Sequence, residues 1–239
     1  MEMSQDKREK GSLLDMRCMA NQDGLGVRAF SDARNKRTFR IKKWLSPCKD
    51  DKIKKYKEYW DQRFWEKIGL SLDEQRQMKN FWPKGGPHWD ALATTEDGEL
   101  LLIEAKAHIS EFTKTSCKAT SQASREKITE VLKIVAEEYG ASFNDAWMNQ
   151  YYQTANRLAH LWKLRSIPSF KDKVRLVYVF FLNDPIDKEN AKREEWMAKF
   201  RDAEIKTLGV EKHRDWISTV FACVKAKSLC DPNRRIEVD

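Results

Sequence analysis

The sequence predicts an α/β domain in which helices flank a mixed central β-sheet. The chain has 239 residues, of which 41% are hydrophobic, and this is enough to bury a substantial core. A strand pair joined by a tight turn at residues 96–98 follows the first amphipathic helix. A further apolar strand at residues 174–182 is reached only through helices, which favours a parallel crossover. A hairpin combined with such a strand gives a mixed sheet with helices on its faces.

The individual elements follow from hydrophobic spacing and from glycines at helix ends. Apolar side chains recur at helical spacing near the start of the domain, namely Ile53, Tyr56, Trp60, Phe64 and Ile68. Gly69 and Gly140 end the helices that precede them. The predicted order is helix, two strands, two helices, strand, helix and strand, over residues 52–68, 88–95, 99–108, 121–139, 144–165, 174–182, 187–208 and 214–226.

Two parts of the chain are distinguished by composition. Residues 1–46 contain short apolar pieces and basic runs, of which RNKRTFRIKKW at residues 34–44 is the longest. We interpret them as a basic N-terminal extension that forms either a small hairpin or an irregular wrap. Residues 47–239 show no interdomain linker and are expected to form one domain.

Net charge, cysteine spacing and the length of apolar runs indicate which partners and which compartment to expect for this protein. The formal net charge is +8 and the isoelectric point is near 9.1, and a basic balance permits binding to nucleic acid. The five cysteines show no C-x-x-C spacing, so we expect reduced thiols in a cytoplasmic protein. No apolar run approaches the roughly 20 residues that span a bilayer, which predicts no membrane partner. The oligomeric state is left open, with a homodimer among the options.

The register of the predicted hairpin decides which charged side chains meet. A two-residue turn would point the Asp90 carboxylate away from Glu104. A three-residue loop at residues 96–98 instead puts Asp90 directly across from Glu104, and it needs Gly98 in the left-handed region. Opposed side chains on antiparallel strands lie about 5 Å apart. Lys106 shares the face of Glu104, because side chains two residues apart point the same way.

This register predicts a site for a divalent cation. Two neighbouring carboxylates repel each other, and burial makes both harder to ionise. A divalent cation, Mg²⁺ or Mn²⁺, would relieve this repulsion. Mg²⁺ prefers oxygen ligands, and the predicted ligands are the carboxylates of Asp90 and Glu104 and the backbone carbonyl of Ala105. Lys106 would assist the attacking water and offset charge on the transition state. The alternative is a plain ion pair of Lys106 with one of the carboxylates at the solvated end of a strand.

Here the chain resembles the PD-(D/E)xK nuclease superfamily, also called restriction-endonuclease-like. The motif is an Asp at the start of one strand and (Asp/Glu)-x-Lys on the next, matched by Asp90 and by the run from Glu104 to Lys106. The resemblance covers about residues 50–183. It implies a core of a helix, a three-stranded antiparallel meander, a helix and a parallel strand. The first meander strand lies either near residues 76–84 or in the N-terminal region. Pro87 stands three residues before the Asp, where the family has it adjacent.

The resemblance implies a Mg²⁺-dependent nuclease that hydrolyses phosphodiester bonds of nucleic acid, with DNA as the expected substrate. A non-cleaving nucleic-acid-binding module on the same fold and an RNA-directed nuclease remain the alternatives, beside an unrelated protein with a structural ion pair. Duplex, branched and single-stranded substrates all remain open. The family also places a Gln or a basic residue on the helix near the site, a role that Gln153 and Arg157 match.

Further residues are candidates for nucleic-acid or metal binding. Lys84 precedes two glycines that allow close approach of a phosphate backbone. His88 and His108 fall on the side of the carboxylates and could contact a phosphate. The family often adds an acid from its first helix to the metal site, for which the chain offers Glu58, Asp61 and Glu66.

Overall fold

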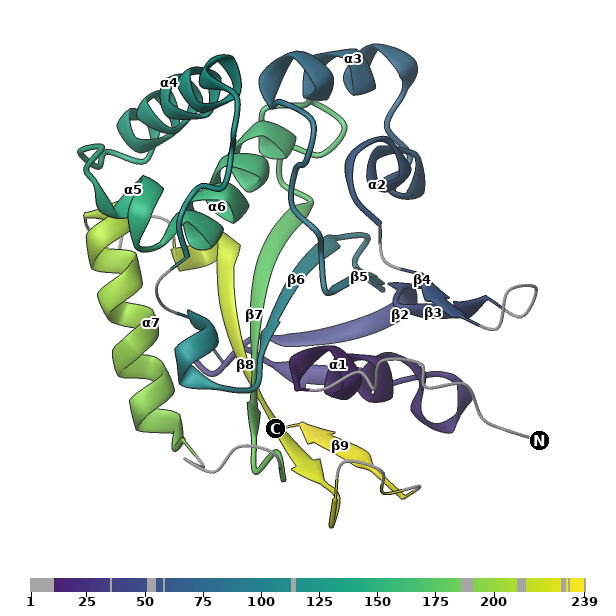
Figure 1. Cartoon of the computed structure of the whole chain (residues 1–239). Coiled ribbons are helices and arrows are strands. Elements are labelled where there is room, and N and C mark those ends of the chain that lie inside the picture. Colours follow the sequence, from purple (N-terminus) through teal and green to yellow (C-terminus); the bar gives the residue numbers. More distant parts are fainter. Residues whose placement is uncertain are drawn as a thin grey trace, which may run out of the picture.

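Figure 1 shows the computed structural model of the chain, in which helices cover a strongly twisted sheet. The fold belongs to the α/β class that the sequence predicts. The structure describes residues 11–34, 36–50, 55–57, 59–112, 115–185, 191–209, 214–228, 231 and 233–238.

The sheet is mixed, as predicted. In the described part of the chain it has seven strands, in the order β1 (Ala29–Ser31), β2 (Thr38–Ser46), β5 (Ala91–Thr95), β6 (Leu100–Lys106), β7 (Val174–Leu182), β8 (Ile217–Lys225) and β9 (Arg235–Val238). The pairs from β1 to β6 are antiparallel, β6, β7 and β8 run parallel, and β9 is antiparallel to β8. A separate small sheet pairs β3 (Cys48–Asp50) with β4 (Lys55–Lys57). The main sheet curves enough to bring its edge strands β1 and β9 close together.

The helices lie on both faces of this sheet. Those that the structure describes are α1 (Ser12–Asn21), α2 (Asp61–Ile68), α3 (Leu72–Phe81), α4 (Gln122–Glu138), α5 (Ala146–Asn149), α6 (Tyr152–Arg165) and α7 (Arg193–Leu208). Helix α6 packs on β7, with α4 and α5 beside it, whereas α1 packs against β6 and β9. Among the described residues, no helix is long and apolar enough to cross a membrane.

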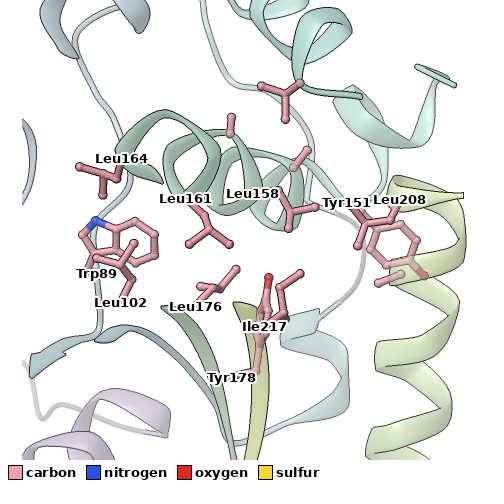
Figure 2. Packing of buried hydrophobic residues seen from close by; sticks show 14 of the residues in the cluster. Trp89, Leu102, Tyr151, Leu158, Leu161, Leu164, Leu176, Tyr178, Leu208 and Ile217 are labelled. Atoms are coloured by element: carbon pink, nitrogen blue, oxygen red, sulfur yellow. The ribbon is translucent and has the colours of Figure 1, made fainter. Parts of the chain in front are cut away.

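Strand β6 is buried along its whole length and contributes side chains to two hydrophobic clusters, one on each face of the sheet. Leu100 and Leu102 pack toward α6, whereas Leu101 and Ile103 pack toward α1. Figure 2 shows leucines of α6 lying over Leu102 and the neighbouring strand β7. Because side chains alternate along a strand, even-numbered residues near the end of β6 also face α6.

The predicted hairpin register is confirmed. Ala91 lies opposite Ile103 and each step along the strands keeps this register, which places Asp90 opposite Glu104. The loop at residues 96–98 closes with Gly98, whose φ is 80°. A side chain at Gly98 would meet no atom within 4 Å, so the backbone conformation alone favours glycine there.

The helix expected over residues 187–208 begins at Arg193, and residues 187–190 of that prediction lie outside the described part of the chain. Two other predicted helices are shortened or interrupted by strand pairing. The helix expected over residues 52–68 begins only at Asp61, because Tyr56 lies in β4 and Tyr59 makes an isolated bridge to Trp89. The helix expected over residues 144–165 is interrupted between α5 and α6. There Tyr151 bridges to Thr115, whose carbonyl accepts the N–H of Tyr152 at 3.0 Å.

The N-terminal region supplies the strand beside β5. Of the two positions considered for it, residues 76–84 are wrong, because α3 occupies most of them after a capping box between Ser71 and Glu74. Strand β2 takes the place instead and pairs with β5. The boundary expected at residue 46 therefore falls at the last residue of a strand in the main sheet. Phe39 and Trp44 of β2 share one hydrophobic cluster with β5 and β6.

Candidate active site

The opposed carboxylates lie at the end of the hairpin formed by β5 and β6. Asp90 immediately precedes β5, is partly exposed, and accepts a hydrogen bond from the N–H of Ala105 at 2.8 Å. Glu104 lies on β6 with 1% of its surface exposed. This end of β6 is also its carboxyl end, and β7 runs parallel beside it. Ligands in open α/β sheets usually bind outside the carboxyl ends of parallel strands.

Each oxygen of the Glu104 carboxylate has a cationic partner. Lys106 Nζ lies 2.5 Å from Oε1, and Arg157 Nε lies 2.7 Å from Oε2. Burial alone would raise the pKa of Glu104, but the charges of Arg157 and Lys106 outweigh burial and lower it below its usual range. The carboxylate is therefore ionised at neutral pH.

The charge of Asp90 is less fully compensated than that of Glu104. Burial, together with the charge of Glu104, raises the pKa of Asp90 to about 7. Lys106 and the N–H of Ala105 favour the ionised form but do not offset these effects. Among the described residues, no donor reaches Oδ1, the second oxygen of this carboxylate. Asp90 can therefore change its protonation state near neutral pH.

Helix α6 contributes two side chains to the same cluster. Gln153 Oε1 accepts a hydrogen bond from Lys106 Nζ at 3.1 Å. One turn further along, Arg157 also donates to the carbonyl of His88 at 2.8 Å and lies over the ring of Trp89, 5.0 Å from its centroid. Both residues were predicted to lie near the site, and the structure brings them together with Glu104 and Lys106. The contact between Arg157 and the ring of Trp89 was not predicted. The position of Trp89 next to Asp90 in the sequence was the one feature that could have indicated it.

The cluster is tightly packed between β6, β7 and α6. Beside the charged groups, Phe112 and Tyr178 line a recess that has no room for a water molecule. Figure 2 shows the Tyr178 side chain on the face of β7 that points toward α6. Asp90 is partly exposed, so it is the member of the carboxylate pair that solvent reaches.

Other predicted residues lie outside this cluster. Lys84 is exposed in the loop before β5, and the imidazole of His88 stacks on Trp60. His108 does not join the carboxylate pair. Its ring lies 4.0 Å from Glu111, beside the start of α1. The strand alternation ends at Lys106, so it no longer directs the side chain of residue 108.

The acids of the first predicted helix also have other partners. Asp61 accepts hydrogen bonds from the N–H groups of Gly85 at 3.0 Å and Gly86 at 2.9 Å, so its carboxylate fixes the loop. Glu66 accepts a hydrogen bond from Gln62 on the surface of α2. Glu58 lies outside the described residues. In the described part of the chain, Asp61 and Glu66 are therefore hydrogen-bonded to groups other than the carboxylate pair.

The donor set suits a hard cation, with one condition. In the described part of the chain, no cluster of three or more His, Cys, Asp or Glu side chains could hold a metal ion. Mg²⁺, however, often binds through one or two carboxylates and keeps several waters. Asp90, Glu104 and the carbonyl of Ala105 offer oxygen donors of this kind. The condition is that Lys106 or Arg157 releases one oxygen of Glu104.

Comparisons with protein-family models, with curated proteins and with solved structures found no match.

Proposed function

We propose that this protein is a Mg²⁺- or Mn²⁺-dependent nuclease that hydrolyses phosphodiester bonds in nucleic acid, with DNA as its substrate. The observation that carries the proposal is the opposition of Asp90 and Glu104 across the hairpin, with Lys106 bound to Glu104 on the same face. Carboxylate oxygens suit a hard cation that can activate a water, and an ammonium beside them can stabilise the negative charge that develops on a phosphate. The net charge of +8 agrees with a polyanionic substrate.

A restriction-endonuclease-like core is the finer description of the fold that we propose. In its support, α1 precedes an antiparallel series of β2, β5 and β6, and α6 leads into β7, which is parallel to β6. On this description, the small sheet, α2 and α3 are insertions between the first and second strands of the series. The carboxylate pair then stands at the place in the fold that the resemblance implies.

In this proposal, some residues of the cluster would bind the metal ion and others would stabilise the transition state. A bound Mg²⁺ would supply positive charge to the phosphate and lower the pKa of a coordinated water. Asp90, Glu104 and the carbonyl of Ala105 would hold the ion. Lys106 is oriented by Gln153 and would stabilise the negative charge that develops in the transition state.

The protonation of Asp90 adds a dependence on pH. A carboxyl group with a pKa of about 7 is protonated in half of the molecules at that pH, and the proton competes with a cation. Affinity for Mg²⁺ should therefore rise between pH 6 and pH 8. Isothermal titration calorimetry at both values measures this directly.

A non-cleaving nucleic-acid-binding module is the second candidate. The specific observation in its favour is that Arg157 and Lys106 already neutralise both oxygens of Glu104. In such a module the cluster would be a buried structural ion pair. Binding of DNA without measurable binding of Mg²⁺ or Mn²⁺ would favour this candidate.

A substrate panel tests the proposed function. The protein is incubated with supercoiled plasmid, linear duplex, single-stranded DNA and RNA, each with Mg²⁺, Mn²⁺ or EDTA. We expect cleavage of at least one DNA substrate with a metal and none with EDTA. Absence of cleavage in every arm, or equal cleavage in EDTA, would contradict the proposal.

A further inference from the structure

Trp60 and His88 form an exposed aromatic stack beside the carboxylate pair. Their ring centroids lie 4.6 Å apart, with an angle of 11° between the ring planes. Trp60 is 37% exposed, and it is the one exposed tryptophan among the nine, all of which lie in the described part of the chain. His88 is exposed as well. Tryptophan is usually highly buried, and its ring is enriched where proteins bind ligands and partners, so this stack is a candidate binding surface.

The stack is held firmly in relation to Asp90. Asp61, next to Trp60, binds the N–H groups of Gly85 and Gly86 in the loop that leads to His88. The carbonyl of His88 accepts a hydrogen bond from Arg157 of the carboxylate cluster. His88 precedes Asp90 by two residues, a separation of about 7 Å in extended chain. A ligand on the stack therefore lies within the span of one or two nucleotides of the carboxylates.

One cation of α2 lies near the stack, and others lie on neighbouring residues. The guanidinium of Arg63 lies 6.0 Å from the centroid of Trp60, and Lys67 Nζ lies 4.9 Å from that of Tyr59. Lys84 is exposed in the loop that Asp61 holds. On α2, Arg63 and Lys67 balance the charges of Asp61 and Glu66, and Lys84 adds one further positive charge beside them. Aromatic faces combined with cations suit a ligand that carries both bases and phosphates.

We infer that the Trp60–His88 stack is a subsite for an unpaired base of single-stranded DNA, which leads the strand to the carboxylate pair. Bases within a duplex are already covered by their neighbours on both faces, so only an unpaired base offers a free face for stacking. This inference rests on the proposed function for its substrate class. It adds that the enzyme prefers a single strand, or a frayed end, over continuous duplex.

Binding measured without cleavage tests this inference separately from the nuclease activity. The probe is a fluorescein-labelled single-stranded 12-mer, followed by anisotropy in EDTA and again in Ca²⁺, with a blunt hairpin duplex as the second probe. We expect Trp60→Leu to weaken binding of the single strand by about 10-fold and to leave duplex binding nearly unchanged. Trp60→Phe, which keeps an aromatic face, should retain most of the affinity. The matched control is Trp162→Leu, a partly exposed tryptophan in the groove between α3, α4 and α6.

An abasic scan sharpens the test. Removing one base at a time from the 12-mer should reveal a position where wild-type affinity falls and the affinity of Trp60→Leu does not. Equal losses for Trp60→Leu and Trp162→Leu, or equal losses on single strand and duplex, would overturn the inference even if the wild type cleaves DNA. Failure of the wild type to bind the single strand would overturn it too. If the wild type cleaves no substrate but binds the single strand in a way that depends on Trp60, the result would support the subsite and contradict the proposed nuclease activity.

Discussion

At the scale of single residues, the opposed acids differ in their electrostatic surroundings. Two cations lower the pKa of Glu104, whereas burial and the charge of Glu104 raise that of Asp90 to about 7. Asp90 thus favours folding in its neutral form. Its contribution to stability is full below the ordinary pKa near 3.9 and is lost as the pH rises through 7.

Asp90→Asn should therefore stabilise the metal-free protein at alkaline pH. Asparagine keeps an oxygen that can accept the hydrogen bond from Ala105 and removes the charge beside Glu104. We expect a gain of about 1–2 kcal/mol in the free energy of unfolding at pH 8, with a smaller gain at pH 5. Urea denaturation at both pH values measures it. An equal gain at the two values, or a loss at pH 8, would show that Asp90 is already ionised without cost.

Lys106 is expected to act on the transition state. Lys106→Ala leaves Arg157 on Glu104 and removes the ammonium that Gln153 orients. The single-turnover rate in Mg²⁺ should fall by about 10²–10³-fold, while affinity for DNA in Ca²⁺ changes little. Lys106→Arg should not restore the rate fully, because a planar guanidinium directs its donors differently. Equal losses of affinity and rate would make Lys106 a phosphate contact, and no loss of either would make it half of a structural ion pair.

At the scale of elements, α6 connects the hydrophobic core to the charged cluster. Its leucines pack on the sheet, and this holds Gln153 and Arg157 over the end of β6. Helical spacing predicted that these two residues share one face, because they stand four apart, and the resemblance implied that this face lies near the site. The break before α6 could not be predicted from the sequence. The break depends on an isolated β-bridge between Tyr151 and Thr115, and these two residues are far apart in the sequence.

Arg157 provides a test of whether a cation can replace a side chain in this cluster. Arg157→Ala leaves Glu104 with Lys106 alone and should cost about 2–4 kcal/mol in EDTA. A saturating concentration of Mg²⁺ should recover part of this loss, because a bound ion stabilises the folded state. Thermal melts with and without Mg²⁺ measure both effects.

Arg165→Ala is the matched control for this experiment. Arg165 lies on the same helix, is also buried, and binds the carbonyl of Val174 and the carboxylate of Asp172 at a distance from the carboxylate pair. It should lose stability without any recovery in Mg²⁺. Similar recovery in both variants would indicate a nonspecific effect of the ion.

The hairpin and β2 show which elements can be predicted from local sequence patterns and which cannot. The turn was predictable because Gly98 and the loop length fix the register locally. Strand β2 has apolar residues at Phe39, Ile41 and Trp44, and an irregular register after Ile41 breaks the alternation by which strands are recognised. The early residues of the helix expected over 52–68 were misassigned for a related reason. Tyr56 fits helical spacing, but pairing with β3 makes its segment extended.

At the scale of the whole molecule, the curved sheet gathers segments from across the chain around one site. The α/β class and the parallel placement of β7 beside β6 were predictable, because a strand reached through helices returns parallel. The final strand β9 and the cover formed by α1 were not, since both depend on contacts between the two ends of the chain. One such contact is the buried ion pair between Asp15 and Arg234.

The most direct test of the central claim compares two buried glutamates at opposite ends of the same hairpin. Glu104 binds Lys106 and Arg157, and Glu99 likewise has two cationic partners, Arg37 and Arg175. Cleavage of the preferred DNA substrate is measured in Mg²⁺ for Glu104→Gln and Glu99→Gln, beside circular dichroism to confirm folding. We predict that Glu104→Gln abolishes cleavage in a folded protein and that Glu99→Gln retains it. Full activity of folded Glu104→Gln would contradict the proposed site.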